Sequence, residues 1–399
     1  MNILVLSNKL PYPPRDGGSI ATLNMLTGLR DTGNRVTCLS LVTRKHPFPV
    51  DRIPESLSGT IRMIGVPCDS TIRPLPMLFN LIFSGEPYIA ERFKVREYEE
   101  RLRDLLLEET FDVIQLEGPY PGHYLDVIRE QSDAVVSLRT HNVEHLIWKR
   151  KSAGESGFLT KKYLENMAKR LERFEFDVVR RSDCLVPISD ADASHFRSAG
   201  YRGPSITIPA GISPDDYPEA PLPKEPTVFF IGALDWLPNQ EGLKWFLDRV
   251  WEKLTESIPE VQFHVAGRNA PSGFARWLQE KGVIYHGEVK NAIEFMHTYR
   301  VMAAPLLTGS GIRIKILEAM ALGRPVVTTP VGIEGIPAED GLEVMVAEDP
   351  GAFSDAVAGL LEKEQKVLRM TENARLLVRQ NFDTFTLSSR LSRFFSHQV

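Results

Sequence analysis

Short apolar runs alternate with amphipathic stretches along the first half of the chain. Each run is rich in Ile, Leu and Val and ends in a polar or glycine-containing loop, as buried parallel strands do. The runs cover residues 2–7, 36–42, 61–67, 111–116, 134–138, 184–188 and 205–208. The stretches between them space their apolar residues as helices do, for example over 20–32 and 161–181. Strands and helices in alternation predict a doubly wound α/β domain over residues 1–208.

The same pattern starts again in the second half. Residues 209–226 hold six prolines and little periodicity, which is typical of a linker between domains. A second α/β domain is then predicted over 227–384, followed by a last helix within 385–399. Its strands are expected at residues 227–232, 262–266, 283–286, 301–306 and 326–328. The predicted fold class is therefore α/β with two Rossmann-like domains.

One apolar segment stands apart because it carries no charge. Residues Leu75 to Phe83 are almost wholly apolar. The pattern favours a helix that is buried in the first domain. The alternative is a surface that meets a lipid-linked acceptor or the membrane interface.

Composition narrows the class of protein. The 399 residues are 43% hydrophobic and 25% charged, which is ordinary for a soluble globular protein. The net charge of −5 gives no reason to expect a nucleic-acid partner. The start of the chain lacks a basic segment and a long apolar run, so neither a signal peptide nor a membrane span is predicted. We expect a cytoplasmic protein, with contact at most with the inner face of the membrane.

Metal chemistry is not indicated by the sequence. Cys38, Cys68 and Cys184 lie far apart in apolar surroundings and are expected to be reduced core residues. His141 and His145 have the i, i+4 spacing of zinc ligands, but Asn142 stands where a zinc protease helix has its glutamate. We predict no metal site and no cofactor.

The richest motif is TGSGIRIKILEAMALGRPVVTTP, residues 308–330. Gly309 and Gly311 permit positive φ and allow a ligand to approach the amides of this turn, which include those of Ser310 and Ile312. A helix is predicted from residue 314 to 322, and a helix N-terminus attracts phosphate. Arg313 and Lys315 add two cations there, and Glu318 follows one turn later. An amphipathic helix with solvated charges explains the same pattern equally well.

Other candidates follow predicted strands, where α/β folds place ligands. Gly17 and Gly18 fall in the loop after the first strand, without the glycine spacing of nicotinamide-binding folds. His141 lies just beyond the run 134–138. Arg268 follows another strand, and Glu334 belongs to the loop GIEGI; both are candidates for the nucleotide site or ordinary surface charges.

The segment GSGIRIKILEAMALGRPVVTTPVGIEGI resembles the donor-binding motif of the retaining family 4 glycosyltransferases, also called group 1, in a branch with GSGIR-K. The resemblance implies the GT-B fold, two Rossmann-like domains facing a cleft, with the last helix packed on the first domain. Glu318 matches the family's second glutamate, which contacts the ribose, whereas Ser310 stands where the first glutamate usually is. Segment HNVE resembles the family's active-site histidine segment, which implies that His141 lies beside the transferred sugar.

Further roles come from the same resemblance. The loop with Gly17 and Gly18 would face the donor phosphates and the acceptor. No basic residue stands at Asp235 or Trp236, where relatives often keep a phosphate ligand, so we assign the diphosphate to Arg313 and Lys315.

The predicted reaction moves a sugar from a nucleotide-diphosphate sugar to a hydroxyl acceptor, which is a glycan or a lipid-linked acceptor, with retention. Cell-surface polysaccharide or glycolipid synthesis is expected by analogy. The alternatives are another GT-B enzyme, such as an epimerase or a phosphorylase, and a non-catalytic subunit that binds a nucleotide sugar.

Overall fold

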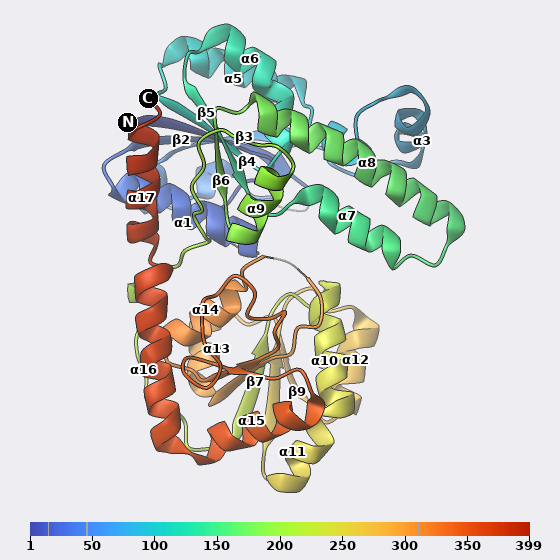
Figure 1. Ribbon diagram of the computed structural model, residues 1–399, viewed down its shortest axis with the longest axis vertical. Helices are drawn as coiled ribbons and strands as arrows, with labels where there is room; N and C mark the ends of the chain where they lie inside the picture. The colour runs from blue at the N-terminus through green and yellow to red at the C-terminus, as the bar shows by residue number, and fades with distance from the viewer. Residues whose placement is uncertain (15, 45–46, 310) are drawn as a thin grey trace. The chain divides into compact units, whose positions relative to one another are not determined.

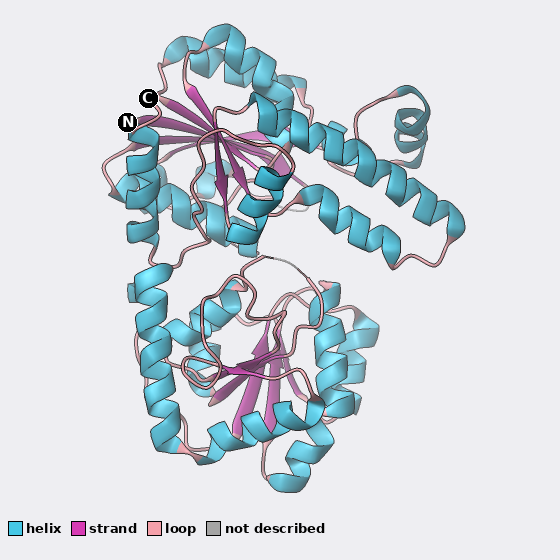
Figure 2. Cartoon of the chain, viewed as in Figure 1, coloured by secondary structure: helices cyan, strands magenta, loops and turns pink. Residues whose placement is uncertain are grey.

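The computed structural model describes residues 1–14, 16–44, 47–309 and 311–399. The chain divides into two compact units: unit 1 comprises residues 1–210 and 384–399, and unit 2 comprises residues 211–383 (Figure 1). Each unit has a central sheet with helices packed on its faces, as Figure 2 shows. No helix in the described parts of the chain has the length and apolar character that a membrane span requires.

Unit 1 is built on a six-stranded parallel sheet in the order β3-β2-β1-β4-β5-β6. The strands are β1 Asn2–Ser7, β2 Arg35–Thr43, β3 Arg62–Cys68, β4 Val113–Glu117, β5 Val135–Thr140 and β6 Cys184–Pro187. The helices are α1 Gly17–Asp31, α2 Glu55–Ser58, α3 Pro74–Phe83, α4 Tyr88–Glu91, α5 Arg96–Glu108, α6 Leu125–Gln131, α7 Glu144–Ala153, α8 Phe158–Arg181, α9 Asp190–Ser198 and α17 Thr384–Ser396. The strand order changes direction between β1 and β4, which is where such sheets bind ligands.

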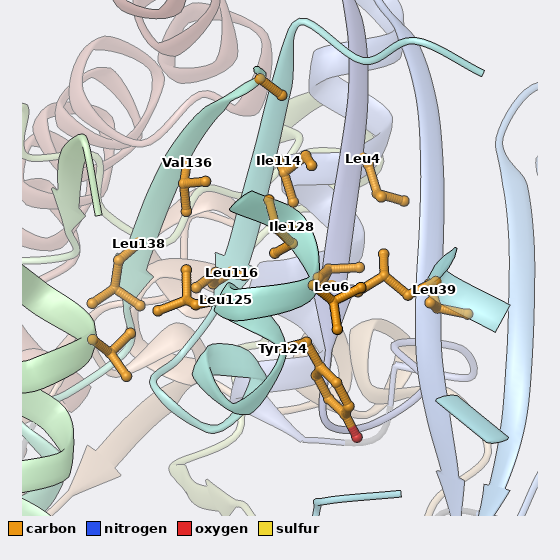
Figure 3. Close-up of a cluster of buried hydrophobic side chains, with 14 of the residues drawn as sticks. Leu4, Leu6, Leu39, Ile114, Leu116, Tyr124, Leu125, Ile128, Val136 and Leu138 are labelled. Atoms are coloured by element: carbon orange, nitrogen blue, oxygen red, sulfur yellow. The ribbon is translucent and has the colours of Figure 1, made fainter. Parts of the chain in front are cut away.

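Both faces of this sheet are apolar, because the side chains of β1 alternate between two cores. Leu4 and Leu6 join the core under α5 and α6, together with Leu116, as Figure 3 shows. Ile3 and Val5 join the other core, which includes residues of α1 and α17. Alternation along a strand that is covered on both sides gives the continuous apolar run seen in the sequence.

Unit 2 repeats this plan with the strand order β12-β11-β10-β7-β8-β9, and all its strand pairs are parallel. The strands are β7 Thr227–Ile231, β8 Gln262–Ala266, β9 Ile284–Gly287, β10 Val301–Ala304, β11 Val326–Thr328 and β12 Met345–Val346. The helices are α10 Leu237–Arg249, α11 Trp251–Ser257, α12 Ser272–Glu280, α13 Ala292–Thr298, α14 Ile314–Ala321, α15 Pro350–Glu362 and α16 Glu364–Asn381.

The proline-rich segment 209–226 is tied to unit 2 along its second half. Arg324, which is fully buried, donates hydrogen bonds to the carbonyls of Ala220 and Pro221. Arg300 donates to the carbonyl of Pro223 at 2.8 Å. Two buried guanidinium groups therefore hold a segment that the sequence suggested was only a linker.

Three local expectations were wrong. Helix α1 begins at Gly17, because the Asp16 side chain accepts a hydrogen bond from the Ser19 amide, so Gly17 and Gly18 lie in the helix and not in a loop. Residues 205–208 form only an isolated bridge, from Ser205 to Leu185. The segment from Leu75 to Phe83 is helical as expected, but it is exposed and not buried.

Candidate functional site

A glycine turn leads directly into α14 in unit 2. Gly309 has φ of 113° and Gly311 has φ of 82°, values that favour glycine. Arg313 is the residue that precedes the helix, and its guanidinium donates to the Gly311 carbonyl at 2.6 Å. The N-terminus of α14 therefore opens on the glycine turn, as the sequence predicted. Ser310 lies outside the described residues.

The ammonium of Lys315 lies at the start of α14 and is partly buried. Its Nζ donates to Asn239 Oδ1 at 2.8 Å and lies 4.0 Å from the centre of the Phe230 ring. Burial, and secondarily the charge of Arg313, lower the pKa of Lys315 to about 7. Asn239 is itself oriented by donating to the Ala233 carbonyl at 2.7 Å. A cation that is held this way by a neutral amide is well placed to gain from an anionic ligand.

Little space is left between the ammonium and the backbone at Gly232, which directly follows β7. A Cβ atom at Gly232 would lie 3.2 Å from Lys315 Nζ and 2.9 Å from Asn239 Nδ2. Glycine at this position therefore leaves room for the lysine and for any group that approaches it.

Glu318 lies one turn into α14, where its carboxylate is shielded from solvent. Tyr217 donates its hydroxyl hydrogen to Glu318 Oε1 at 3.0 Å. Burial raises the pKa of Glu318, and the Tyr217 hydroxyl opposes that rise. Tyr217 comes from the proline-rich segment, about one hundred residues away in sequence, and nothing in its local pattern marks it as a site residue.

Two further elements border the turn. The Arg313 guanidinium lies 5.8 Å from the centre of the Trp236 ring, which is 39% exposed. Burial lowers the pKa of Arg313, and the nearby charge of Glu334 opposes that shift. Ile312 packs beside Gly335, where an added Cβ would lie 3.1 Å from Ile312 Cγ1.

The predicted residues of unit 2 are thus largely brought together. Gly309, Gly311, Ile312, Arg313, Lys315, Glu318 and Glu334 lie in or beside this turn and helix. Arg268 follows β8, and its carbonyl accepts a hydrogen bond from the Leu234 amide at 2.9 Å. Its position is therefore at a neighbouring strand end, fixed by the backbone. The sequence reasoning missed Tyr217 and Asn239 and gave Trp236 no role.

In unit 1 a buried carboxylate organises the ends of β4 and β5. Glu117 accepts hydrogen bonds from Thr22 Oγ1 at 2.9 Å, Gln115 Nε2 at 2.6 Å and Arg139 Nη1 at 3.1 Å. His141 Nε2 lies 2.7 Å from Glu117 Oε2. Burial acts to raise the pKa of Glu117, but the charges of Arg139 and His141 and these hydrogen bonds lower it to about 2. Glu117 directly follows the apolar run 111–116, and the sequence predicted no role for it.

His141 is held at the rim of this network. Its side chain is 22% exposed, whereas those of Glu117 and Arg139 are almost fully buried. An ionised carboxylate can only accept, so His141 donates from Nε2. In the neutral ring Nδ1 is then the acceptor.

Helix α7 begins just after His141 and is anchored by acidic residues. Glu175 on α8 accepts from the amides of Glu144 and His145, so it caps the N-terminus of α7. Glu144 accepts a hydrogen bond from the Tyr120 hydroxyl at 3.0 Å. Burial and the neighbouring Glu175 raise the pKa of Glu144 to about 7.

Gly17 and Gly18 form the first turn of α1, near a different cation. Lys9 Nζ pairs with Asp16 Oδ1 at 2.6 Å, and a Cβ at Gly18 would lie 3.0 Å from that Nζ. Glycine here permits the close approach of Lys9. No group of three or more His, Cys, Asp or Glu side chains is arranged to hold a metal ion in the residues that the structure describes.

Residues 225–363 match the model of the family described as "Glycosyl transferases group 1". These residues therefore form a group 1 glycosyltransferase domain. This glycosyltransferase is 27% identical over 394 residues, 96% of either chain, to an uncharacterized 44.6 kDa protein in the cps region of Klebsiella pneumoniae. It is 28% identical over 229 residues to the lipopolysaccharide core biosynthesis mannosyltransferase LpsB of Rhizobium meliloti, spanning 51% of this chain and 63% of LpsB.

Solved structures show the same fold over the full length of the glycosyltransferase. Sucrose-phosphate synthase of Thermosynechococcus elongatus superimposes with a TM-score of 0.72 at 17% identity, covering 100% of this chain and 99% of the other. HepE of Anabaena, in complex with UDP-glucose, gives a TM-score of 0.65 at 15% identity and covers 100% of both chains. At these identities the likeness establishes the fold, which is GT-B with two parallel six-stranded sheets.

Proposed function

We propose that this glycosyltransferase moves a sugar from a nucleotide-diphosphate sugar to a hydroxyl acceptor with retention of anomeric configuration. The acceptor is a glycan or a lipid-linked glycan of cell-surface polysaccharide or glycolipid synthesis. The names of its relatives support this class, since they include a lipopolysaccharide core mannosyltransferase and phosphatidyl-myo-inositol mannosyltransferases. HepE, which shares the fold, is described with UDP-glucose.

The observation that carries the proposal is the position of the Lys315 ammonium, which lies at the start of α14 and donates a hydrogen bond to the neutral amide of Asn239. Burial lowers the pKa of this partly buried ammonium to about 7, so its charge is unfavourable in the free protein. A diphosphate beside it would offset that cost and favour the protonated form. The N-terminus of α14 adds its dipole and the amides of the glycine turn.

The same contacts serve the chemistry of transfer. As the sugar leaves, negative charge grows on the diphosphate, and Lys315, Arg313 and the turn amides stabilise it. Each positioned donor in a water-poor site is worth roughly 2–4 kcal/mol to the transition state. In this proposal the leaving group is held by the cations of the chain itself, without a metal ion.

Glu318 and His141 complete the assignment. The Glu318 carboxylate, positioned by Tyr217, accepts hydrogen bonds from the ribose hydroxyls. His141, oriented by Glu117, contacts hydroxyls of the transferred sugar or the acceptor. The start of α1 at Gly17 and Gly18, with Lys9 beside it, faces the donor phosphates and the acceptor, while Arg268 and Glu334 are weaker candidates at the edge of the nucleotide site.

A thermal-shift screen across nucleotide sugars tests the proposal, since a ligand of the folded state raises its melting temperature. UDP-glucose and GDP-mannose are the first donors to try. We expect one donor class to raise the melting temperature of the wild type. The same donor should not change the melting temperature of the variant Lys315→Met. Lys281→Met is the matched control, because Lys281 pairs with Asp248 on the surface of the same unit.

Turnover is measured separately, as release of the nucleoside diphosphate with an acceptor present. No response to any nucleotide sugar, or an equal response in Lys315→Met, would overturn the diphosphate assignment. Binding without turnover for every acceptor would favour a non-catalytic subunit.

A further inference from the structure

Helix α3 of unit 1 turns its apolar side to the solvent. Leu75, Leu78, Phe79, Ile82 and Phe83 follow the i, i+3, i+4, i+7, i+8 spacing of a single helical face. Each of these side chains is between 53% and 80% exposed. The rings of Phe79 and Phe83 lie together on this face, with their centres 4.6 Å apart. In a water-soluble domain such a face normally points into the core.

The opposite side of α3, with Met77, Asn80 and Leu81, is the less exposed one. Asn80 is the buried residue of the helix, and its amide donates to the Glu86 carbonyl at 3.1 Å and to the Glu91 carboxylate. Arg170 on α8 donates to the carbonyls of Asn80, Leu81 and Ser84, which end the helix. Polar contacts therefore fix α3, which Figure 1 shows at the edge of unit 1, while its apolar stripe is exposed.

The stripe itself carries no charge. Between residues 70 and 85 the chain has no acidic residue and one basic one, Arg73, which pairs with Asp69. The N-terminal end of α8 has a second pair of exposed apolar side chains. Phe158 is 72% exposed and Leu159 is 81% exposed. That end lies about 18 Å along α8 from Arg170, twelve residues at about 1.5 Å each.

Two exposed lysines flank this second pair in sequence. They are Lys151 near the end of α7 and Lys162 near the start of α8, and the loop 154–157 joins the two helices. Lys162 also lies 4.0 Å from the carboxylate of Glu165. Aromatic and aliphatic side chains flanked by lysines are typical of surfaces that lie in the headgroup region of a bilayer.

We propose that α3, together with the tip of the α7–α8 hairpin, docks unit 1 on the surface of a phospholipid bilayer that contains anionic lipids. The stripe on α3 enters the boundary between headgroups and acyl chains, and Lys151 and Lys162 meet the lipid phosphates. This docking goes beyond sugar transfer, and it brings the enzyme to the surface where a lipid-linked acceptor is presented.

Co-sedimentation with extruded vesicles tests the docking without donor or acceptor, so its result is independent of transferase activity. The vesicles are phosphatidylcholine alone and phosphatidylcholine mixed with phosphatidylglycerol. We expect the wild type to bind the mixed vesicles more strongly. The double variant Phe79→Ser with Phe83→Ser should lose about tenfold or more in partition coefficient.

Leu107→Ser is the matched control, because Leu107 is 78% exposed on α5 of the same unit. It should bind vesicles as the wild type does. The variant Lys151→Glu with Lys162→Glu should lose the preference for anionic vesicles. Since all these side chains are exposed, the variants are expected to keep the wild-type melting temperature.

Three results would overturn the proposal. The first is a wild type that binds neither kind of vesicle. The second is an equal loss in Leu107→Ser and in the double phenylalanine variant. The third is a dimer in sedimentation equilibrium that the phenylalanine variant dissociates, which would assign the surface to a second copy of the chain.

Discussion

His141 Nε2 lies 2.7 Å from Glu117 Oε2, at the point where β4 and β5 end side by side. Glu117 and Arg139 are partners in the register of these two strands, and their side chains form a buried ion pair. The histidine is therefore attached to the sheet through a carboxylate that is itself fixed by strand pairing. Glu117 thus orients the ring of His141 through Nε2.

We expect Glu117→Gln to lower both kcat and stability. The substitution leaves Arg139 buried without its counter-charge, which costs about 3–5 kcal/mol in comparable sites. The ring of His141 loses a fixed acceptor, so kcat should fall by roughly tenfold or more. Chemical denaturation and turnover assays measure the two effects.

The matched control is Thr22→Val, which removes one neutral donor to the same carboxylate and should cost about 1 kcal/mol. The pH dependence adds a second test. The folded pKa of Glu117, about 2, lies below the ordinary value, so its contribution is present above about pH 4 and is lost as the pH falls toward 2. The gap in stability between wild type and Glu117→Gln should narrow in the same range. A constant gap would contradict the assigned ionisation.

Lys315→Met should abolish donor binding and stabilise the free protein. The folded pKa of Lys315 is about 7, below that of an unfolded lysine, so folding releases a proton between about pH 7 and 10. The wild type should gain stability as the pH rises through this range, whereas the methionine variant should lack that gain. Below pH 7 the variant should be more stable by roughly 1–2 kcal/mol, because the ammonium keeps partial contact with solvent.

The affinity of the wild type for the donor should depend on the protonation of Lys315. Binding of the diphosphate favours protonated Lys315, so affinity should weaken as the pH rises above about 7. Calorimetry in buffers of different ionisation enthalpy measures the proton uptake. Binding that is independent of pH would count against Lys315 as a phosphate ligand.

Gly232→Ala should weaken donor binding by roughly tenfold while the unit stays folded. The new methyl group would lie 2.9 Å from Asn239 Nδ2 and 3.2 Å from Lys315 Nζ, so the amide that holds the ammonium must shift and the ammonium must shift slightly with it. Titration with the nucleoside diphosphate measures the affinity. Gly273→Ala is the matched control, because a Cβ there meets no atom within 4 Å. Equal affinities in the two variants would show that the space beside Gly232 is not used.

The sequence predicted what lies close together along the chain. The turn at Gly309 and Gly311 and the start of α14 follow from glycines next to good helix formers, and both are confirmed. Tyr217 and Asn239 were missed, because they reach α14 from segments far away in sequence. Such contacts depend on tertiary packing, which local periodicity does not encode.

The error at α3 has a different cause. Periodicity identified an apolar helical stripe, but it carries no information about which way that stripe points. The direction is set by Asn80 and by Arg170, which lies ninety residues away from it.

At α1 the predicted boundary was late by three residues, because Asp16 was not identified as the N-cap.

Gly28→Ala should loosen the last helix from unit 1. A Cβ at Gly28 would lie 2.1 Å from Ser388 Oγ and 2.8 Å from Thr384 Cγ2, so α1 and α17 would have to move apart. Overpacking of this kind costs about 1–3 kcal/mol. Faster hydrogen exchange of the α17 amides, together with a lower melting temperature, would measure the effect.

Two companion variants separate crowding from helix propensity. Gly359→Ala lies in α15 with no atom within 4 Å of its Cβ, and should stabilise by about 0.5–1 kcal/mol. Ser388→Gly added to Gly28→Ala should recover part of the loss, because it removes the nearest clash. If Gly28→Ala were instead as stabilising as Gly359→Ala, the close approach of α1 and α17 would not hold in solution.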